Sequence, residues 1–204
     1  MNLTEALRQI AVDFNLNAQD LIAYAGEDTE SGWDYGHGGW RVGSLFKEEG
    51  QVIYALVRAL KPQNVLEIGV CTGCSATHIL MALERNGSGK LTSIDVDPGA
   101  GKQLPDRYRG VWEFVRADAL WWLEQTERKF DFCFEDSVHS YEFTKPVLEL
   151  ARARGAKVIL SHDATHRDTG TAVSQAVIEA LGSLRTVTID PSDCGMAYWQ
   201  GNGR

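Results

Sequence analysis

The sequence predicts an α/β protein with a Rossmann-like sheet of seven strands that is mostly parallel, has a reversed last strand and carries helices on both faces. Two observations lead to this prediction. From residue 44 onward, short apolar runs alternate with segments of helical periodicity, which is typical of parallel strands joined by crossover helices. The last two apolar runs are separated by Asp190-Pro191-Ser192-Asp193. Because this connection is too short for a crossover helix, the two strands are expected to pair antiparallel.

Two helices are expected before the alternating part. The apolar residues of 3–14 recur at helical spacing and predict an amphipathic helix, and a second short helix is expected over 18–25. Residues 26–43 are rich in glycine and aromatic side chains and show no period, so they are predicted to form a loop. This loop is expected to act as a lid. We therefore divide the chain into residues 1–43 and a main domain, residues 44–204.

The alternating part defines the remaining elements. A helix with Ser44 as its N-cap is expected to end before Pro62. The predicted strands cover residues 63–69, 90–95, 112–117, 130–136, 156–162, 184–190 and 194–200. The predicted helices cover residues 74–86, 118–128, 140–154 and 170–182, with weaker helical character over 100–108.

The composition limits the classes of partner. The formal net charge of −8 and the pI near 5.1 argue against a nucleic-acid partner, because binding phosphates needs clustered Lys and Arg. No apolar run reaches the roughly 18 residues that cross a bilayer, and the first residues lack the order of a signal peptide. The four cysteines fall mostly on expected core segments, as reduced thiols do. We expect a cytoplasmic protein without a membrane partner. A homo-oligomer would cover the apolar stripe of the first helix.

A glycine turn follows the first strand of the alternating part. In a parallel sheet this turn lies at the carboxyl edge, where nucleotide-like ligands bind, and Gly69 and Gly73 allow the backbone to approach a ligand closely. Asp95 ends the next strand, 22 residues after Gly73, where an acid accepts hydrogen bonds from ribose hydroxyls. Asp118, followed by Ala119, ends the third strand. It either meets an adenine amino group or caps the following helix.

The residues around the glycines narrow the choice of nucleotide. An NAD-binding turn has the pattern Gly-x-Gly-x-x-Gly, but Cys71 and Cys74 occupy its second and third glycine positions. Glu67 comes two residues before Gly69. Its carboxylate suits a ligand with positive charge near its ribose and repels a pyrophosphate.

The spacing Cys71-x-x-Cys74 also occurs in redox dithiols. Here the intervening Thr72-Gly73 completes the glycine turn, so we interpret the two cysteines as small residues of that turn. Thr72 and Ser75 are then expected to hydrogen-bond the ligand.

These motifs together resemble a known family. Glu67-x-Gly69-x-x-x-Gly73 resembles the first motif of class I S-adenosylmethionine-dependent methyltransferases. Asp95 resembles their ribose-binding acid and Asp118 their adenine-side acid, and the reversed last strand is also found in their fold. The resemblance covers roughly residues 44–200. It implies that S-adenosylmethionine is the cofactor and that its binding residues are Glu67, Gly69, Thr72, Gly73, Ser75, Asp95, Asp118 and Ala119.

A second group of polar residues follows two later strands. Asp136 and His139 come after the fourth strand, and His162 and Asp163 end the fifth, so all are expected at the same crevice. Asp136 and Asp163 offer oxygen ligands for Mg²⁺, Ca²⁺ or Mn²⁺, and a neutral His162 would favour a transition metal. The alternative is structural: His162 hydrogen-bonds Asp136 as a pair, and His139 caps or orients the helix at residue 140.

This second pattern resembles the small O-methyltransferase branch related to the catechol and caffeoyl-CoA enzymes. In that branch, two strand-end acids and an amide bind a divalent cation that lowers the pKa of the acceptor hydroxyl. Asp136 matches the first acid, whereas the pair at 162 and 163 is His-Asp instead of Asp-Asn. His139 falls where those enzymes place a lysine general base, and imidazole can do the same work. The resemblance implies catalytic roles for His139 and Asp136, and a divalent cation such as Mg²⁺ or Mn²⁺ on Asp136, His162 and Asp163.

The function expected from these patterns is methyl transfer from S-adenosylmethionine to a hydroxyl of a small-molecule acceptor. Three alternatives remain at this point: a metal-dependent hydrolase or hydroxylase-like relative on the same fold, an NAD-type oxidoreductase, and a non-catalytic nucleotide-binding module. The acceptor is not defined by the sequence, because the segments that shape its pocket vary freely on one fold.

Overall fold

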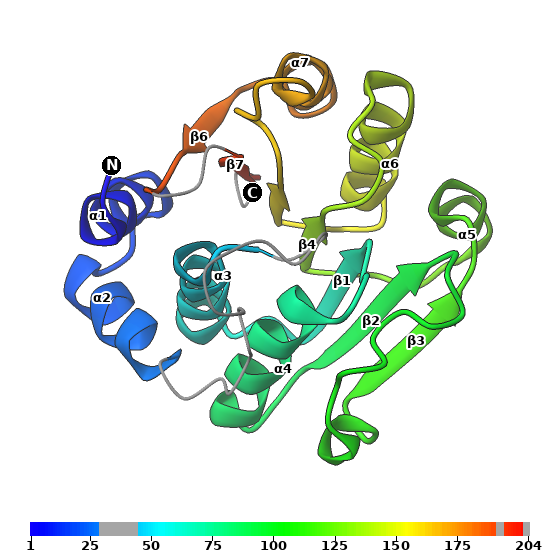
Figure 1. Ribbon diagram of the computed structural model, residues 1–204, viewed down its shortest axis with the longest axis horizontal. Helices are drawn as coiled ribbons and strands as arrows, with labels where there is room; N and C mark the ends of the chain where they lie inside the picture. Colours follow the sequence, from blue (N-terminus) through cyan, green and yellow to red (C-terminus); the bar gives the residue numbers. More distant parts are fainter. Residues whose placement is uncertain (29–44, 191–193, 202–204) are drawn as a thin grey trace.

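The computed structural model describes residues 1–28, 45–190 and 194–201, which form a three-layer α/β/α structure (Figure 1). The sheet has seven strands in the order β3-β2-β1-β4-β5-β7-β6. The strands are β1 (Asn64–Ile68), β2 (Lys90–Asp95), β3 (Trp112–Arg116), β4 (Phe132–Glu135), β5 (Val158–Ser161), β6 (Arg185–Val187) and β7 (Met196–Gln200). The first five pair in parallel, and β7 runs antiparallel to both β5 and β6. The predicted fold class, with its reversed last strand, is confirmed.

Helices cover both faces of the sheet, each with its own apolar core. One face is covered by α1 (Leu3–Phe14), α2 (Ala18–Glu27), α3 (Lys47–Leu60) and α4 (Cys74–Asn86), and the other by α5 (Ala119–Gln125), α6 (Tyr141–Ala153) and α7 (Gly170–Leu181) (Figure 1). Burial of apolar surface on both faces explains why the central parallel strands read as continuous apolar runs. None of the helices in these described ranges is long and apolar enough to cross a membrane.

The N-terminal helices are part of the main core. The apolar stripe of α1, which includes Leu7, Ile10 and Phe14, is buried together with residues of α3 and β7. Asn2 and Asn17 begin α1 and α2 by accepting hydrogen bonds from the first free backbone N–H groups. The stripe is therefore covered by the same chain and does not need a second copy. The expected Ser44 cap and the aromatic loop lie outside the described residues, and the domain division at residue 43 remains a prediction.

Two predicted helices are shorter in the structure. Within 100–108, the structure has a single 3₁₀ turn, Asp106–Tyr108, because Gly101 adopts a left-handed conformation and Pro105 cannot continue a helix. Helix α5 ends at Gln125 instead of residue 128. The Arg154 side chain donates hydrogen bonds to the carbonyls of Leu123 and Glu124, which satisfies this early end. A local sequence pattern does not show these two hydrogen bonds, because Arg154 is about 30 residues away from the end of α5.

Candidate active site

The glycine turn joins β1 to α4 at the carboxyl edge of the sheet. Gly69 and Gly73 both have positive φ, +85° and +100°, as expected for glycines in a sharp turn. A Cβ at Gly69 would lie 2.1 Å from the carbonyl oxygen of Asp136, and one at Gly73 would lie 2.9 Å from Cγ of Leu104. Both glycines therefore permit a close approach of other segments of the protein, and the predicted approach to a ligand remains a prediction.

Asp95 holds the glycine turn from the next strand. One oxygen of its carboxylate, Oδ2, accepts hydrogen bonds from the backbone N–H groups of Val70 (2.9 Å) and Cys71 (3.2 Å). The other, Oδ1, accepts one from the N–H of Asp97. Both oxygens are thus oriented by the backbone, and the carboxylate also faces a cavity. A charged acceptor is in place where the sequence predicted a ribose-binding acid.

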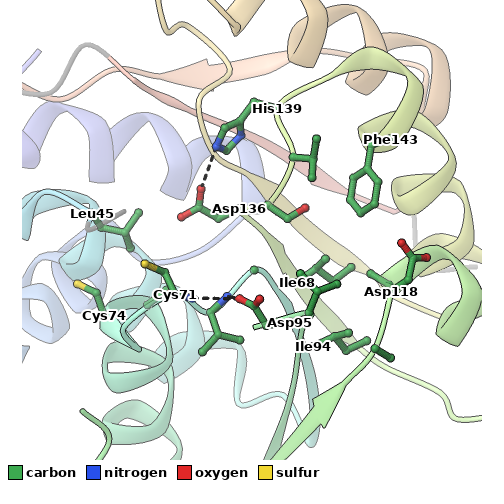
Figure 2. A pocket seen from close by; sticks show the side chains of 18 residues that line it. Leu45, Ile68, Cys71, Cys74, Ile94, Asp95, Asp118, Asp136, His139 and Phe143 are labelled. Atoms are coloured by element: carbon green, nitrogen blue, oxygen red, sulfur yellow. Dashed lines mark hydrogen bonds and ion pairs between the residues drawn. The ribbon is translucent and has the colours of Figure 1, made fainter. Parts of the chain in front are cut away.

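The cavity above the turn has a volume of about 380 Å³, which is within the usual range for a small-molecule site. In Figure 2, Asp136 and His139 lie on one side of this cavity and Asp95 on the opposite side, while Asp118 and Phe143 lie at one end. The predicted site residues that line it are Gly69, Ser75, Asp95, Asp118, Ala119, Asp136 and His139. Those outside the lining are Glu67, Thr72, Gly73, His162 and Asp163.

Glu67 lies below the cavity and organises three elements. Its carboxylate is fully buried and accepts hydrogen bonds from the hydroxyls of Ser75 on α4 (2.6 Å) and Ser93 on β2 (2.5 Å). Burial raises the pKa of Glu67 to about 7, although both serine hydrogen bonds act in the opposite direction. In this arrangement Glu67 reaches the cavity through Ser75, which does line it.

Replacement of Glu67 by glutamine is expected to change how stability depends on pH. Because the pKa of Glu67 is higher in the folded than in the unfolded state, the folded protein binds more protons between about pH 4.5 and 7. The free energy of unfolding of the wild type is therefore expected to fall by about 3 kcal/mol as the pH rises through this window. Glu67→Gln, which lacks the titrating group, should not show this fall. Urea unfolding from pH 4 to pH 8 measures the difference. The exposed Glu142→Gln is the control, and parallel curves for wild type and Glu67→Gln would contradict the expectation.

Thr72 and Asp118 differ in how they relate to the predicted ligand. The hydroxyl oxygen of Thr72 is buried and has no hydrogen-bond partner among the described residues. The Asp118 carboxylate accepts a hydrogen bond from the N–H of Trp121 (2.9 Å), so it caps α5, and it also lines the cavity. Of the two roles considered for Asp118, the capping role is present in the structure and the cavity position leaves the other open.

Cys71 and Cys74 are not joined by a disulfide.

Asp136, His139, His162 and Asp163 come together, as predicted, beside the cavity. His139 Nε2 lies 3.0 Å from Asp163 Oδ2 and 3.8 Å from Asp136 Oδ1. Its other ring nitrogen, Nδ1, is buried without a hydrogen-bond partner in the described part of the chain. The N-cap of α6 is Ser140, whose hydroxyl accepts from the N–H of Phe143, so His139 does not have the expected alternative role as a cap.

His162 is buried next to three carboxylates. Its Nδ1 lies 3.3 Å from Asp136 Oδ1 and 3.2 Å from Asp163 Oδ1, and its Nε2 lies 3.2 Å from Glu49 Oε2. Burial alone would lower the pKa of His162, but the charges of Asp136 and Glu49 raise it well above its usual value of 6.5. The pairing of His162 with Asp136, the structural alternative from the sequence, is thus present.

Two buried acids of this region were missed by the sequence analysis. Glu49 of α3 is buried at the His162 ring, and its position four residues after Leu45 and three before Val52 on the apolar face was a usable signal. Glu135 ends β4 and accepts hydrogen bonds from the hydroxyls of Ser137 and Ser161. Burial raises the pKa of Glu135. The signal for Glu135 in the sequence was its position directly after the apolar run Phe132-Cys133-Phe134, which indicates a buried acid.

The predicted metal ligands do not have the geometry of a metal site. A histidine ligand must be neutral and direct a lone pair to the metal. Both ring nitrogens of His162 instead lie within 3.3 Å of carboxylate oxygens, whose charges raise the pKa of the ring and favour its protonated form. Among the described residues, no group of three or more His, Cys, Asp or Glu side chains is arranged to hold a metal ion. The residues therefore do not fit the divalent cation that the sequence analysis expected.

Topology and cavity together define a nucleotide-type site at the carboxyl edge of a Rossmann-like sheet whose last strand is reversed. Residues 66–164 match a family model described as a methyltransferase domain. This part of the chain, which carries the glycine turn and the strand-end acids, is thus similar to a methyltransferase domain.

Individual proteins show the same similarity. The chain is 33% identical over 131 residues to tricin synthase 2 of Oryza sativa subsp. japonica, a match that covers 58% of this chain and 43% of that protein. It is 29% identical over 157 residues to a caffeoyl-CoA O-methyltransferase of Populus kitakamiensis, covering 70% and 65%. The chain spans about half the length of the curated relatives it matches.

The fold is also found in solved structures of low sequence identity. The O-methyltransferase TomG of Streptomyces achromogenes, solved with S-adenosylmethionine, matches over the full length of both chains with a TM-score of 0.64 and 18% identity. An O-methyltransferase of Bacillus cereus, solved with S-adenosylhomocysteine, matches with a TM-score of 0.65 and 14% identity, covering 95% of this chain and 96% of that one.

Proposed function

We propose that this protein transfers the methyl group of S-adenosylmethionine to a hydroxyl oxygen of a small molecule. The observation that supports this best is the cavity itself, where an oriented carboxylate, Asp95, lies opposite a histidine, His139. The relatives named as O-methyltransferases support oxygen as the methylated atom. An NAD-type oxidoreductase is disfavoured because the turn lacks the second and third glycines that a pyrophosphate needs.

The cavity suits this cofactor by its size and chemistry. Asp95 is proposed to accept hydrogen bonds from the ribose hydroxyls, and Asp118 with Ala119 to lie at the adenine end. The walls near Asp118 are apolar and include Ile94, Val96 and Phe143, which suits a flat base. Ser75 and the Gly69 backbone are proposed to contact the amino-acid end. Glu67, Thr72 and Gly73 are proposed to act indirectly, through the shape of the turn.

His139 is proposed as the general base. Asp163 Oδ2 lies 3.0 Å from Nε2 of His139, so we propose that Nε2 carries the ring proton and donates a hydrogen bond to Asp163. In this tautomer Nδ1 has the free lone pair that a general base needs. Burial would raise the pKa of Asp163, but hydrogen bonding to His162 and the charge of His162 lower it to about 2, so Asp163 stays ionised.

When bound, S-adenosylmethionine supplies an electrophilic methyl group on a sulfonium. Transfer would form the bond from this methyl to the acceptor oxygen and break the methyl–sulfur bond, which leaves S-adenosylhomocysteine, while the hydroxyl proton would pass to Nδ1 of His139. The protein contributes proximity, alignment and this proton acceptor.

The wider setting of the protein is also a proposal. The net charge of −8 supports a small-molecule acceptor in place of a nucleic acid. The buried Cys74, Cys133 and Cys194 form no disulfide, which supports a reducing location such as the cytoplasm. The prediction of a homo-oligomer loses its main argument, because α1 is covered within the chain.

Isothermal titration with S-adenosylhomocysteine tests the cofactor. We expect the wild type to bind it, and Asp95→Asn to bind at least about tenfold more weakly, since hydrogen bonds to a charged acceptor are lost. Asp97→Asn is the matched control: Asp97 lies two residues away, its carboxylate accepts a hydrogen bond from the backbone N–H of Gly99, and it is outside the cavity lining. Equal affinity of wild type and Asp95→Asn would contradict the proposed site.

A further inference from the structure

A partly buried group of one histidine and three acids lies behind the proposed base. We name it the His162 cluster; it consists of Glu49, Asp136, His162 and Asp163. These side chains come from α3, from the segment after β4 and from the end of β5, and each carboxylate has an oxygen 3.2–3.3 Å from a ring nitrogen of His162. Glu49 and His162 are almost fully buried, whereas Asp136 also faces the cavity. The cluster therefore connects the interior of the protein to the active site.

The geometry leaves no room for neutral His162 as a ligand. A carboxylate oxygen lies within 3.3 Å of each ring nitrogen, although the contact of Nε2 with Glu49 is an ion pair and not a hydrogen bond among the described residues. The state that stabilises all three acids has a proton on each nitrogen, with the positive charge shared between them. A ring of this kind has no lone pair to donate to a metal. The buried carboxylate of Glu49 needs a compensating positive charge, and the ring lies where it can supply one to Glu49 and to the half-buried Asp136 and Asp163.

We propose that His162, as a fixed cation, takes the place of a divalent metal in this protein, and that the site binds no such metal. This inference deepens the proposed function and rests on it for the role of the neighbouring His139. The raised pKa of His162 agrees with it, as does the pKa of about 2 for Asp163.

His162 acts in this arrangement as a positioning residue. It does not line the cavity. Its positive charge acts on the active site indirectly, by holding the carboxylates of Asp136 and Asp163 in place. Asp163 is kept ionised and oriented, with Oδ1 towards His162 and Oδ2 towards Nε2 of His139. A divalent cation would activate the acceptor oxygen directly, whereas the fixed histidine cation orients a base that does so.

The direct test uses the wild-type protein and Mn²⁺ alone, followed by isothermal titration and by electron paramagnetic resonance of the free ion, with and without S-adenosylhomocysteine. We expect no stoichiometric binding at millimolar Mn²⁺ and no change in Tm. Binding of one Mn²⁺ per chain, with a rise in Tm that His162→Gln abolishes, would overturn the proposal.

Two variants that remove the imidazole of His162 test whether this ring is what prevents metal binding. His162→Asp combined with Asp163→Asn restores the Asp-Asn pair of the branch that the sequence resembles, and it should bind one Mn²⁺ per chain and gain Tm with the ion. His162→Gln leaves three acids without their cation, so its Tm should fall and then recover partly on addition of Mn²⁺. His166→Gln, on the same loop but outside the cluster, is the control and should behave like the wild type in both measurements. If neither cluster variant responds to Mn²⁺, His162 is not what excludes the metal and the proposal is wrong.

These outcomes are separate from those of the cofactor test. A wild type that binds neither Mn²⁺ nor S-adenosylhomocysteine would contradict the proposed function and leave the metal-free cluster supported. A wild type that binds both would support the proposed function and overturn the fixed cation.

Discussion

Replacing His139 by alanine is expected to lower kcat by about 10²–10⁴-fold, the usual contribution of a positioned general base, and to leave the affinity for S-adenosylhomocysteine unchanged. The ring of His139 lines the cavity, its Nε2 is held by Asp163 at 3.0 Å, and its Nδ1 has no partner in the described structure. Loss of the ring removes the proton acceptor but none of the groups proposed to contact the cofactor. The measurement is methyl transfer from labelled S-adenosylmethionine to a panel that includes caffeoyl-CoA and simple catechols.

Two further variants make this prediction specific to the base. His139→Gln can still donate a hydrogen bond to Asp163 but has no basic nitrogen, so it should be as slow as the alanine variant. Added imidazole should partly restore the activity of His139→Ala, because it can enter the space of the missing ring. Glu142→Gln, three residues further along, changes an exposed side chain outside the cavity lining and should keep most of the activity. Full activity of His139→Gln would exclude the proposed role.

Gly69→Ala is expected to destabilise the protein by about 3 kcal/mol or more. The added Cβ would lie 2.1 Å from the carbonyl oxygen of Asp136 and 2.9 Å from Cα of Ser137, so the backbone after β4 has to move. The positive φ of +85° adds about 1–2 kcal/mol of conformational strain for any residue with a Cβ. Because the displaced segment carries Asp136, methyl transfer should be lost together with stability. Urea unfolding followed by tryptophan fluorescence measures the change.

Gly87→Ala separates the two contributions. Gly87 also has a positive φ, +66°, but a Cβ there would meet no atom within 4 Å. It should therefore show the conformational strain alone, about 1–2 kcal/mol. Equal destabilisation by the two substitutions would show that the contact with Asp136 carries no cost.

The order of strands and helices was predictable because it depends on local patterns. Apolar strands, helical periods and the short 190–193 connection each reflect the physics of a few neighbouring residues, and all seven strands appear where these patterns predict them. The same holds for the glycines at 69 and 73, whose conformation is required by the turn itself. The shorter α5 shows the limit, because its end depends on Arg154, far away in the sequence.

The candidate site was predictable in its members and less so in their roles. Strand topology brings Asp95, Asp136, His139 and His162 to one edge, and the sequence identified all four. Glu67 was expected at the ligand but is sealed under the turn by two serines. Glu49 was not identified: its position on the apolar face of a helix indicated burial, but its contact with His162 depends on how α3 packs against the end of β5.

The sequence by itself determined the fold class, the position of the cavity and the resemblance to methyltransferases, because all of these follow from residue types at fixed spacing along strands and turns. The tertiary structure alone decided the state of His162. The charge of a buried imidazole depends on the groups around it, and here they come from α3, from the segment after β4 and from the end of β5. A histidine that the local pattern presents as a metal ligand is, in the folded chain, surrounded by three acids and held as a cation.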